Sequence, residues 1–89
     1  MKTYLVECYL PRTHATELAE VAARLSARHR RNEHADQLAR YVRSTYVPED
    51  EICFHLFEAE SVDAVGEAAR RASLTFDRIV EAEENHPVR

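Results

Sequence analysis

The sequence predicts an α+β domain in which four strands and two helices follow one another in the order βαββαβ. Four stretches are rich in aromatic, β-branched and aliphatic residues, and two others repeat apolar residues at the spacing of a helix. The 89 residues contain one glycine and three prolines, which is typical of dense regular structure with short connections. We expect a single domain over residues 1–84 and a polar tail over residues 85–89.

The first strand is predicted over residues 3–10, where alternation separates an apolar set from a set that carries Glu7. The apolar set is expected to face the core and consists of Tyr4, Val6, Cys8 and Leu10. A helix follows, from an N-cap near Thr13 to about Arg31. Its apolar stripe has the spacing of an amphipathic helix and consists of Leu18, Val21, Ala22 and Leu25.

The second and third strands are predicted over residues 38–47 and 51–58, joined into a β-hairpin by a turn that begins at Pro48. Ser61 is expected to cap a second helix, and the last strand covers residues 76–83. This order is that of the ferredoxin-like fold, in which two helices cover one face of a four-stranded antiparallel sheet.

The other face of this sheet is left open by the helices. The third strand has two largely apolar sets, and we assign Ile52, Phe54 and Leu56 to the core because the central positions of that set are wholly apolar. The open face is then expected to carry Leu5, Glu7, Tyr9, Tyr41, Arg43, Thr45, Cys53, His55, Phe57, Ile79, Glu81 and Glu83. Such a face is too apolar to be solvated alone, so we expect a homodimer through it.

Charge and cysteine content exclude several classes of protein. Twelve basic and sixteen acidic residues give a net charge of −4, and no concentrated basic face stands out, which argues against nucleic-acid binding. No stretch approaches the about 20 apolar residues that span a bilayer. Cys8 and Cys53 are far apart in apolar runs, which is typical of buried free thiols. We therefore expect a cytoplasmic protein without a membrane partner.

Several segments resemble one family of small proteins. They are the opening YLVECYLP at residues 4–11, VPEDE at 47–51, LFEA at 56–59 and FDRIVEA at 76–82. These segments are similar to a ferredoxin-like domain-of-unknown-function family often described as nickel-binding proteins, and the resemblance covers nearly the whole chain. It implies the same fold, dimers of the α+β-barrel kind and nickel as a possible cofactor. The chain departs from the family pattern at residues 12–14, and at His55, where a cysteine is common.

The residues also suggest a site on the open face. Glu7 and His55 are expected to lie on adjacent central strands, with Cys53 two residues before His55. Imidazole, carboxylate and thiolate are ligands that nickel, copper or zinc accept, so Glu7, Cys53 and His55 are the candidate metal ligands. A plain Glu7–His55 hydrogen bond in a dimer interface is the simpler alternative. The candidate ligand pocket on the same face consists of Glu7, Tyr9, Tyr41, Arg43 and Phe57.

The sequence leaves three functions open. The first is a small dimer that is either metal-associated, with nickel as the metal that the resemblance implies, or ligand-binding. The second is a small dimeric-barrel enzyme of the isomerase or cofactor-free monooxygenase type that uses His55 or Glu7 as a base, which rests on analogy between folds. The third is a dimeric module without catalysis. The other four histidines, His14, His29, His34 and His86, are expected to be solvated.

Overall fold

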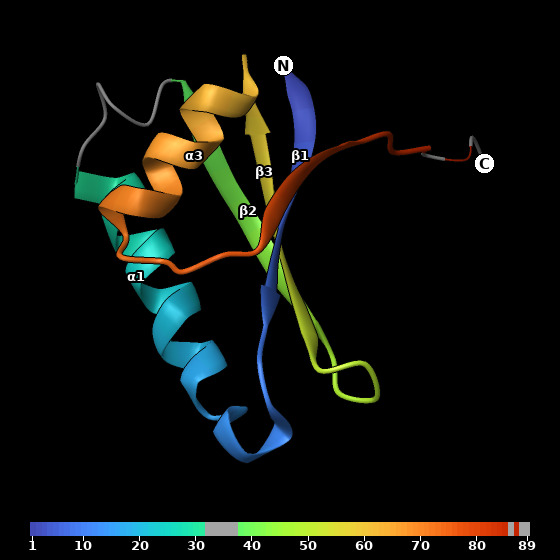
Figure 1. The fold of residues 1–89 in the computed structure, drawn as a ribbon. Coiled ribbons are helices and arrows are strands. Elements are labelled where there is room, and N and C mark those ends of the chain that lie inside the picture. Colours follow the sequence, from blue (N-terminus) through green and yellow to red (C-terminus); the bar gives the residue numbers. More distant parts are fainter. Residues whose placement is uncertain (32–37, 86, 88–89) are drawn as a thin grey trace.

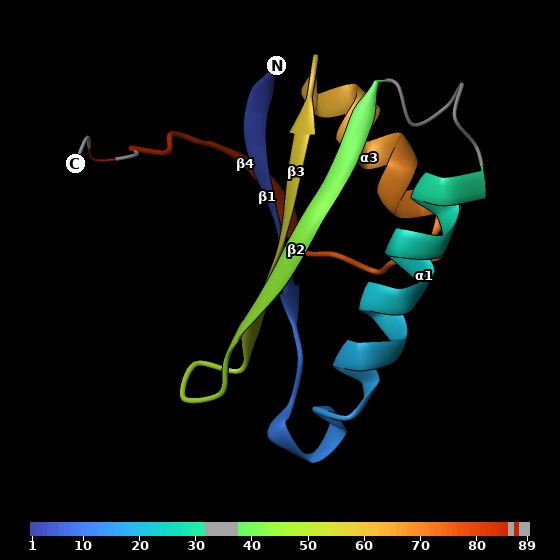
Figure 2. The same cartoon turned by 180° about the vertical axis from the view of Figure 1, so that it is seen from behind.

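The computed structural model describes residues 1–31, 38–85 and 87, and of residues 28–31 the backbone alone. Its strands form one antiparallel sheet in the order β2-β3-β1-β4. Both helices lie on the same side of this sheet (Figures 1 and 2), which confirms the α+β ferredoxin-like class. The bounds are β1 Lys2–Tyr9, η1 Arg12–His14, α1 Glu17–Arg31, β2 Ala39–Val47, β3 Ile52–Ala59, α3 Val62–Arg71 and β4 Arg78–Ala82.

The first helix begins later than the sequence predicts. Thr13 does not cap it but lies inside η1, a single 3-10 turn. Here the amide of His14 donates to the carbonyl of Pro11 and the amide of Ala15 to that of Arg12, so the chain closes on i→i+3 bonds before α1 starts at Glu17. None of the helices in the described part of the chain is long and apolar enough to cross a membrane.

The second helix has well-defined ends. The hydroxyl of Ser61 accepts a hydrogen bond from the amide of Ala64 at 3.2 Å, which confirms the predicted cap. At the other end, Ser73 adopts a left-handed backbone with φ of 57°. The amide of Leu74 donates to the carbonyl of Ala69 and that of Ser73 to Arg70, the pattern of a Schellman motif. Glycine is the usual residue at this position, because a Cβ atom disfavours the left-handed conformation.

Replacing Ser73 by glycine is therefore expected to raise the free energy of unfolding by about 0.5–1 kcal/mol. The gain is smaller than the full relief of the left-handed conformation, since glycine also loses more backbone freedom on folding. Urea unfolding of the purified variant measures this change. Ser73→Ala keeps the Cβ atom and should give no gain. Equal stability of Ser73→Gly and Ser73→Ala would contradict the prediction.

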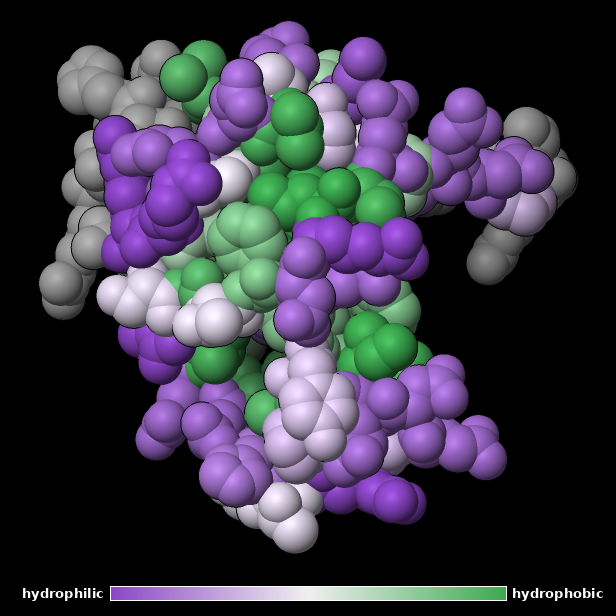
Figure 3. Space-filling model, viewed as in Figure 1, coloured by the Kyte–Doolittle hydropathy of each residue, from purple (hydrophilic) through white to green (hydrophobic). Residues whose placement is uncertain are grey.

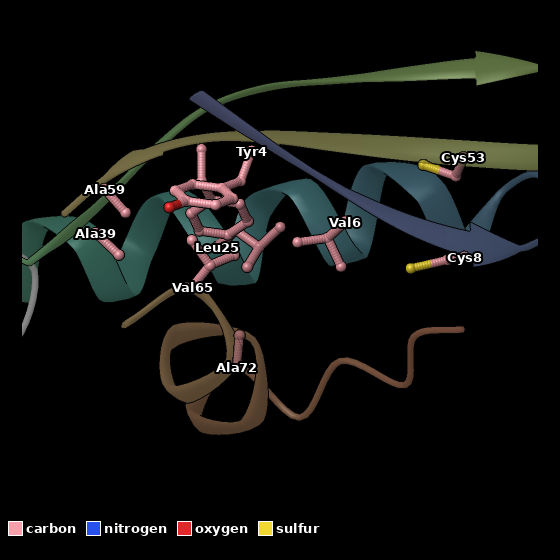
Figure 4. Packing of buried hydrophobic residues seen from close by; sticks show 10 residues of the cluster. Tyr4, Val6, Cys8, Leu25, Ala39, Cys53, Ala59, Val65 and Ala72 are labelled. Carbon is pink, nitrogen blue, oxygen red and sulfur yellow. The ribbon is translucent and has the colours of Figure 1, made fainter. Parts of the chain in front are cut away.

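The core lies between the sheet and the two helices. Figure 4 shows Tyr4, Leu25 and Val65 packed together, with the two cysteines at one end of the cluster. Tyr4, Val6 and Cys8 face the helices and are 0–7% exposed, so the predicted facing of β1 is confirmed. The two hydrophobic layers are thus β1 and β3 on one side and the apolar stripes of α1 and α3 on the other.

The predicted facing of β3 is wrong. Its register pairs Val6 with His55, Tyr4 with Phe57 and Cys8 with Cys53. Directly paired residues of an antiparallel sheet share a face, so Cys53, His55 and Phe57 lie on the helix side with β1's buried set. They are 1%, 2% and 2% exposed. The other set lies on the open face and consists of Ile52, Phe54 and Leu56.

Strands β2 and β4 also differ from the predicted facing. A bulge between Tyr41 and Arg43 shifts the alternation of β2, so Tyr41 pairs with Phe57 on the helix side while Arg43 and Thr45 stay on the open face. In β4 the register pairs Ile79 with Val6, so this side chain packs against the core instead of the open face. Glu81 pairs with Tyr4 and is likewise on the helix side, and Glu83 lies beyond the strand.

The open face of the sheet is apolar at its centre. Its apolar residues are Leu5, Val47, Ile52, Phe54, Leu56 and Val80. An ion pair between Glu7 and Arg78, with Oε2 and Nε 3.0 Å apart, lies on the same face. No helix in the described part of the chain covers this face (Figure 2).

Candidate functional site

A cavity of about 260 Å³ lies at one end of the helix side of the sheet. Its walls come from the ends of β1 and β3, the first half of α1 and the segment 73–75 that leads from α3 toward β4. Figure 1 shows the elements that carry these residues, namely α1, the lower part of β1 and the connection that follows α3. Figure 3 shows hydrophobic residues in the middle of this side of the molecule, with hydrophilic residues around them. The cavity is lined by Cys8, Tyr9, Leu10, Glu17, Leu18, Val21, Arg24, Cys53, His55, Ser73, Leu74 and Thr75.

His55 is the buried polar residue of this cavity. It is 2% exposed, and its Nδ1 lies 2.6 Å from the hydroxyl oxygen of Ser44. That hydroxyl lies 2.6 Å from the hydroxyl of Tyr41, so a chain of polar groups runs from β2 to the imidazole. Nε2, on the other side of the ring, lies 3.6 Å from the sulfur of Cys53. The bulge in β2 creates this arrangement, because it brings Tyr41 to the helix side, where Ser44 already lies three residues later.

The buried groups of the cavity are uncharged at neutral pH. Burial lowers the pKa of His55 from its ordinary 6.5 to about 4, since the charged imidazolium would lose its hydration. Burial raises the pKa of Cys53 to about 11 and, with smaller contributions from Cys53 and Asp77, that of Cys8 to about 12. Both cysteines are free thiols. A thiolate nucleophile is therefore not the ordinary state of either side chain.

The structure separates the predicted metal ligands. Glu7 pairs with Phe54 and Arg78 on the open face, whereas Cys53 and His55 lie on the helix side. The predicted shared site of Glu7, Cys53 and His55 is therefore wrong, and so is a Glu7–His55 hydrogen bond. The prediction fails because β3 faces the opposite way from the one expected, so Cys53 and His55 lie on the helix side of the sheet.

The predicted ligand pocket is divided in the same way. Glu7 and Arg43 lie on the open face, while Tyr41 and Phe57 form an edge-to-face ring pair on the helix side with centroids 5.7 Å apart. Tyr9 is 62% exposed at the end of β1, where it also borders the cavity. Arg43 approaches Glu84, with 3.8 Å between Nη2 and Oε1. These five residues therefore do not form one pocket.

Metal-ligating side chains are sparse in the described part of the chain. Among residues 1–27, 38–85 and 87, no three His, Cys, Asp or Glu side chains are grouped so that they could hold a metal ion. Cys53 and His55 form one adjacent pair. His14 and Glu17 form another on the surface, with Nδ1 and Oε2 2.6 Å apart and both side chains more than half exposed. His34 and His86 lie outside the described residues, as does the side chain of His29.

Sequence reasoning missed two parts of this site. Ser44 orients His55 and faces the core side by simple alternation, but it was not singled out because His55 was assigned to the opposite face. Segment 73–75 closes one wall of the cavity, and its left-handed Ser73 is not a residue that marks such a turn. Both cavity cysteines face the core, but the sequence predicts this direction for Cys8 alone.

Comparison with known proteins places this fold in a family. Residues 4–82 match the family described as nickel responsive protein SCO4226-like. The crystal structure of SCO4226 from Streptomyces coelicolor A3(2) is similar to this chain, with a TM-score of 0.73 and 16% sequence identity. The similarity covers 94% of this chain and 99% of that one, and at this identity it concerns the fold. No curated protein sequence matches the chain.

Proposed function

Since this chain belongs to the nickel-responsive SCO4226-like protein family, we propose that it is a small metal-associated protein whose metal is nickel. The observation that carries the proposal is the family match, which spans residues 4–82 and so nearly the whole domain. The proposal includes a homodimer and a reducing compartment, the cytoplasm. Two buried free thiols support that compartment, because disulfides are rare there.

The donors that the structure describes in one protomer do not by themselves fit a resident nickel ion. Nickel accepts imidazole, carboxylate and thiolate ligands, but the described residues offer them in pairs and not in larger groups. The Cys53–His55 pair is enclosed, and the raised pKa of Cys53 opposes the thiolate form that a metal binds. The exposed His14–Glu17 pair has donors that nickel can reach. Nickel on this pair completes its coordination with water or with donors of another protomer.

Calorimetric titration of the untagged protein with nickel, after metal analysis, tests this function. We expect saturable binding, weakened about tenfold or more by His14→Ala, since one of two protein ligands is lost. Cys53→Ala is the matched control in the enclosed pair, and it should leave the affinity unchanged. Absence of nickel binding by the wild-type protein would contradict the proposed function. Loss of binding in Cys53→Ala alone would place the metal in the cavity and contradict this assignment of its ligands.

The homodimer is proposed through the open sheet face. Leu5, Phe54 and Leu56 occupy neighbouring positions at its centre, and a second copy offers the same apolar surface. Charged pairs such as Glu7–Arg78 and Arg40–Glu58 lie beside this centre, as the polar residues of an interface do.

Analytical ultracentrifugation at micromolar concentration is expected to show a dimer. Phe54→Glu introduces a carboxylate at the centre of the open face, directly opposite Glu7, and should give a monomer, because burial of this charge in the interface is strongly unfavourable. Ala23→Glu, at an exposed position of α1, is the control and should remain dimeric. A wild-type monomer throughout the micromolar range would refute the proposed interface.

A further inference from the structure

The cavity beside His55 has a buried end and an exposed end. Cys8, Cys53 and His55 are at most 7% exposed, whereas Glu17 and Thr75 are solvent-exposed. The apolar part of the wall between them consists of Leu10, Leu18, Val21 and Leu74. Polar and apolar groups line the cavity in about equal measure, and small-molecule binding sites likewise combine apolar walls with polar groups that fix the orientation of the ligand.

The buried end offers one hydrogen-bonding position. Nδ1 of His55 is held by Ser44 at 2.6 Å, which fixes the orientation of the ring. Nε2 lies 3.6 Å from the sulfur of Cys53, and it has no nitrogen or oxygen partner within the part of the chain that the structure describes. Sulfur is a weak partner, and buried ring nitrogens are normally better satisfied. An oxygen atom of a bound molecule would provide the stronger hydrogen bond.

The volume limits the size of such a molecule. A protein cavity of about 150 Å³ lined by apolar side chains takes up benzene. The present cavity, of about 260 Å³, has room for a single ring with substituents. One wall is held in place, because Nε of Arg24 in α1 donates to the carbonyl of Ala72 after α3, 3.1 Å away. The cavity is therefore bounded by connected elements and is not a gap beside a free chain end.

We propose that this cavity binds an uncharged, substituted monocyclic aromatic compound whose hydroxyl or carbonyl oxygen hydrogen-bonds to Nε2 of His55. The ring lies against Leu18, Val21 and Leu74, and its oxygen points toward the buried end. A charged group at that end would lose its hydration without meeting an opposite charge, which is unfavourable. Binding of this ligand does not depend on nickel. Of the proposed nickel donors His14 and Glu17, only Glu17 lines the cavity, and it lies at the exposed end.

Titration of the full-length protein with para-ethylphenol, followed by heteronuclear NMR, tests the proposal. We expect saturable shifts at Cys8, Cys53, His55 and Leu74. Ethylbenzene has the same ring and ethyl group without the oxygen, and it should bind about tenfold more weakly for want of one hydrogen bond. Equal affinity of the two compounds, or shifts that do not saturate, would overturn the proposal.

Two variants locate the binding in the cavity. Val21→Phe places a larger side chain in the apolar wall and should abolish the saturable shifts, while it leaves His55 and Ser44 in place. Ala23→Phe adds the same ring at an exposed position of α1 and should bind as the wild type does. Wild-type affinity in Val21→Phe would overturn the proposal. Nickel titration of Val21→Phe should be unchanged, so failure of this proposal and failure of the nickel function are distinguishable.

Discussion

Replacing Phe57 by alanine is expected to lower the free energy of unfolding by about 3–5 kcal/mol, the largest effect of any change considered for this chain. The ring is 2% exposed on the helix side of β3 and packs edge-to-face on Tyr41. Truncation removes this apolar contact area and leaves a cavity that the surrounding core fills incompletely. Urea unfolding at fixed protein concentration measures the change, since the proposed dimerisation would make the stability depend on concentration.

Phe57→Leu is the matched control for this experiment. Leucine keeps much of the buried volume, so the expected loss is about 1 kcal/mol. A loss below about 1 kcal/mol for Phe57→Ala would contradict the helix-side position of the ring. It would agree instead with the sequence-based expectation that Phe57 lies on the open face.

The second large effect is a loss of stability at mildly acidic pH that depends on His55. Its pKa is about 4 in the folded protein and 6.5 when unfolded, so between these values the unfolded state binds a proton that the folded state does not. Acidification from pH 7 to pH 5 should therefore lower the free energy of unfolding by about 2 kcal/mol through this residue. Below about pH 4 the folded state is protonated as well, and the contribution of His55 becomes constant.

His55→Phe removes this contribution, and its unfolding free energy should depend less on pH by the same amount. The substitution also leaves the hydroxyl of Ser44 without its imidazole partner, which costs stability at every pH and cancels in the comparison between two pH values. Urea unfolding of both proteins at pH 7, 6 and 5 measures the difference. Parallel pH profiles for the two proteins would show that His55 is not enclosed.

Local sequence patterns predicted the elements and part of their packing. The alternation of residues 3–10 places charge in one set alone, and that asymmetry correctly identified Tyr4, Val6 and Cys8 as the buried set. The cap at Ser61 was also predicted, because a hydroxyl residue before an amphipathic stretch satisfies free helix amides. In both cases the deciding interaction lies within a few residues of the chain.

The facing of β3 could not be decided in this way. Both of its sets are apolar, so burial of either set gives a similar hydrophobic gain, and the pairing of Val6 with His55 selects one of them. That pairing joins residues far apart in the sequence. The bulge beside Val42 could not be predicted either. Valine, the residue that it leaves unpaired, is common in regular strands and does not indicate a bulge. The candidate site was misplaced because it depended on these two long-range features.

The central structural claim is that His55 lies enclosed on the helix side of the sheet, neutral and held by Ser44. A pH titration of the histidine ring signals by heteronuclear NMR tests it most directly. We expect the His55 ring to remain neutral, in a single tautomer, from pH 7 down to about 5, and to titrate with a pKa of about 4. Titration of His55 near its ordinary value of 6.5 would place the ring in solvent and contradict the claim.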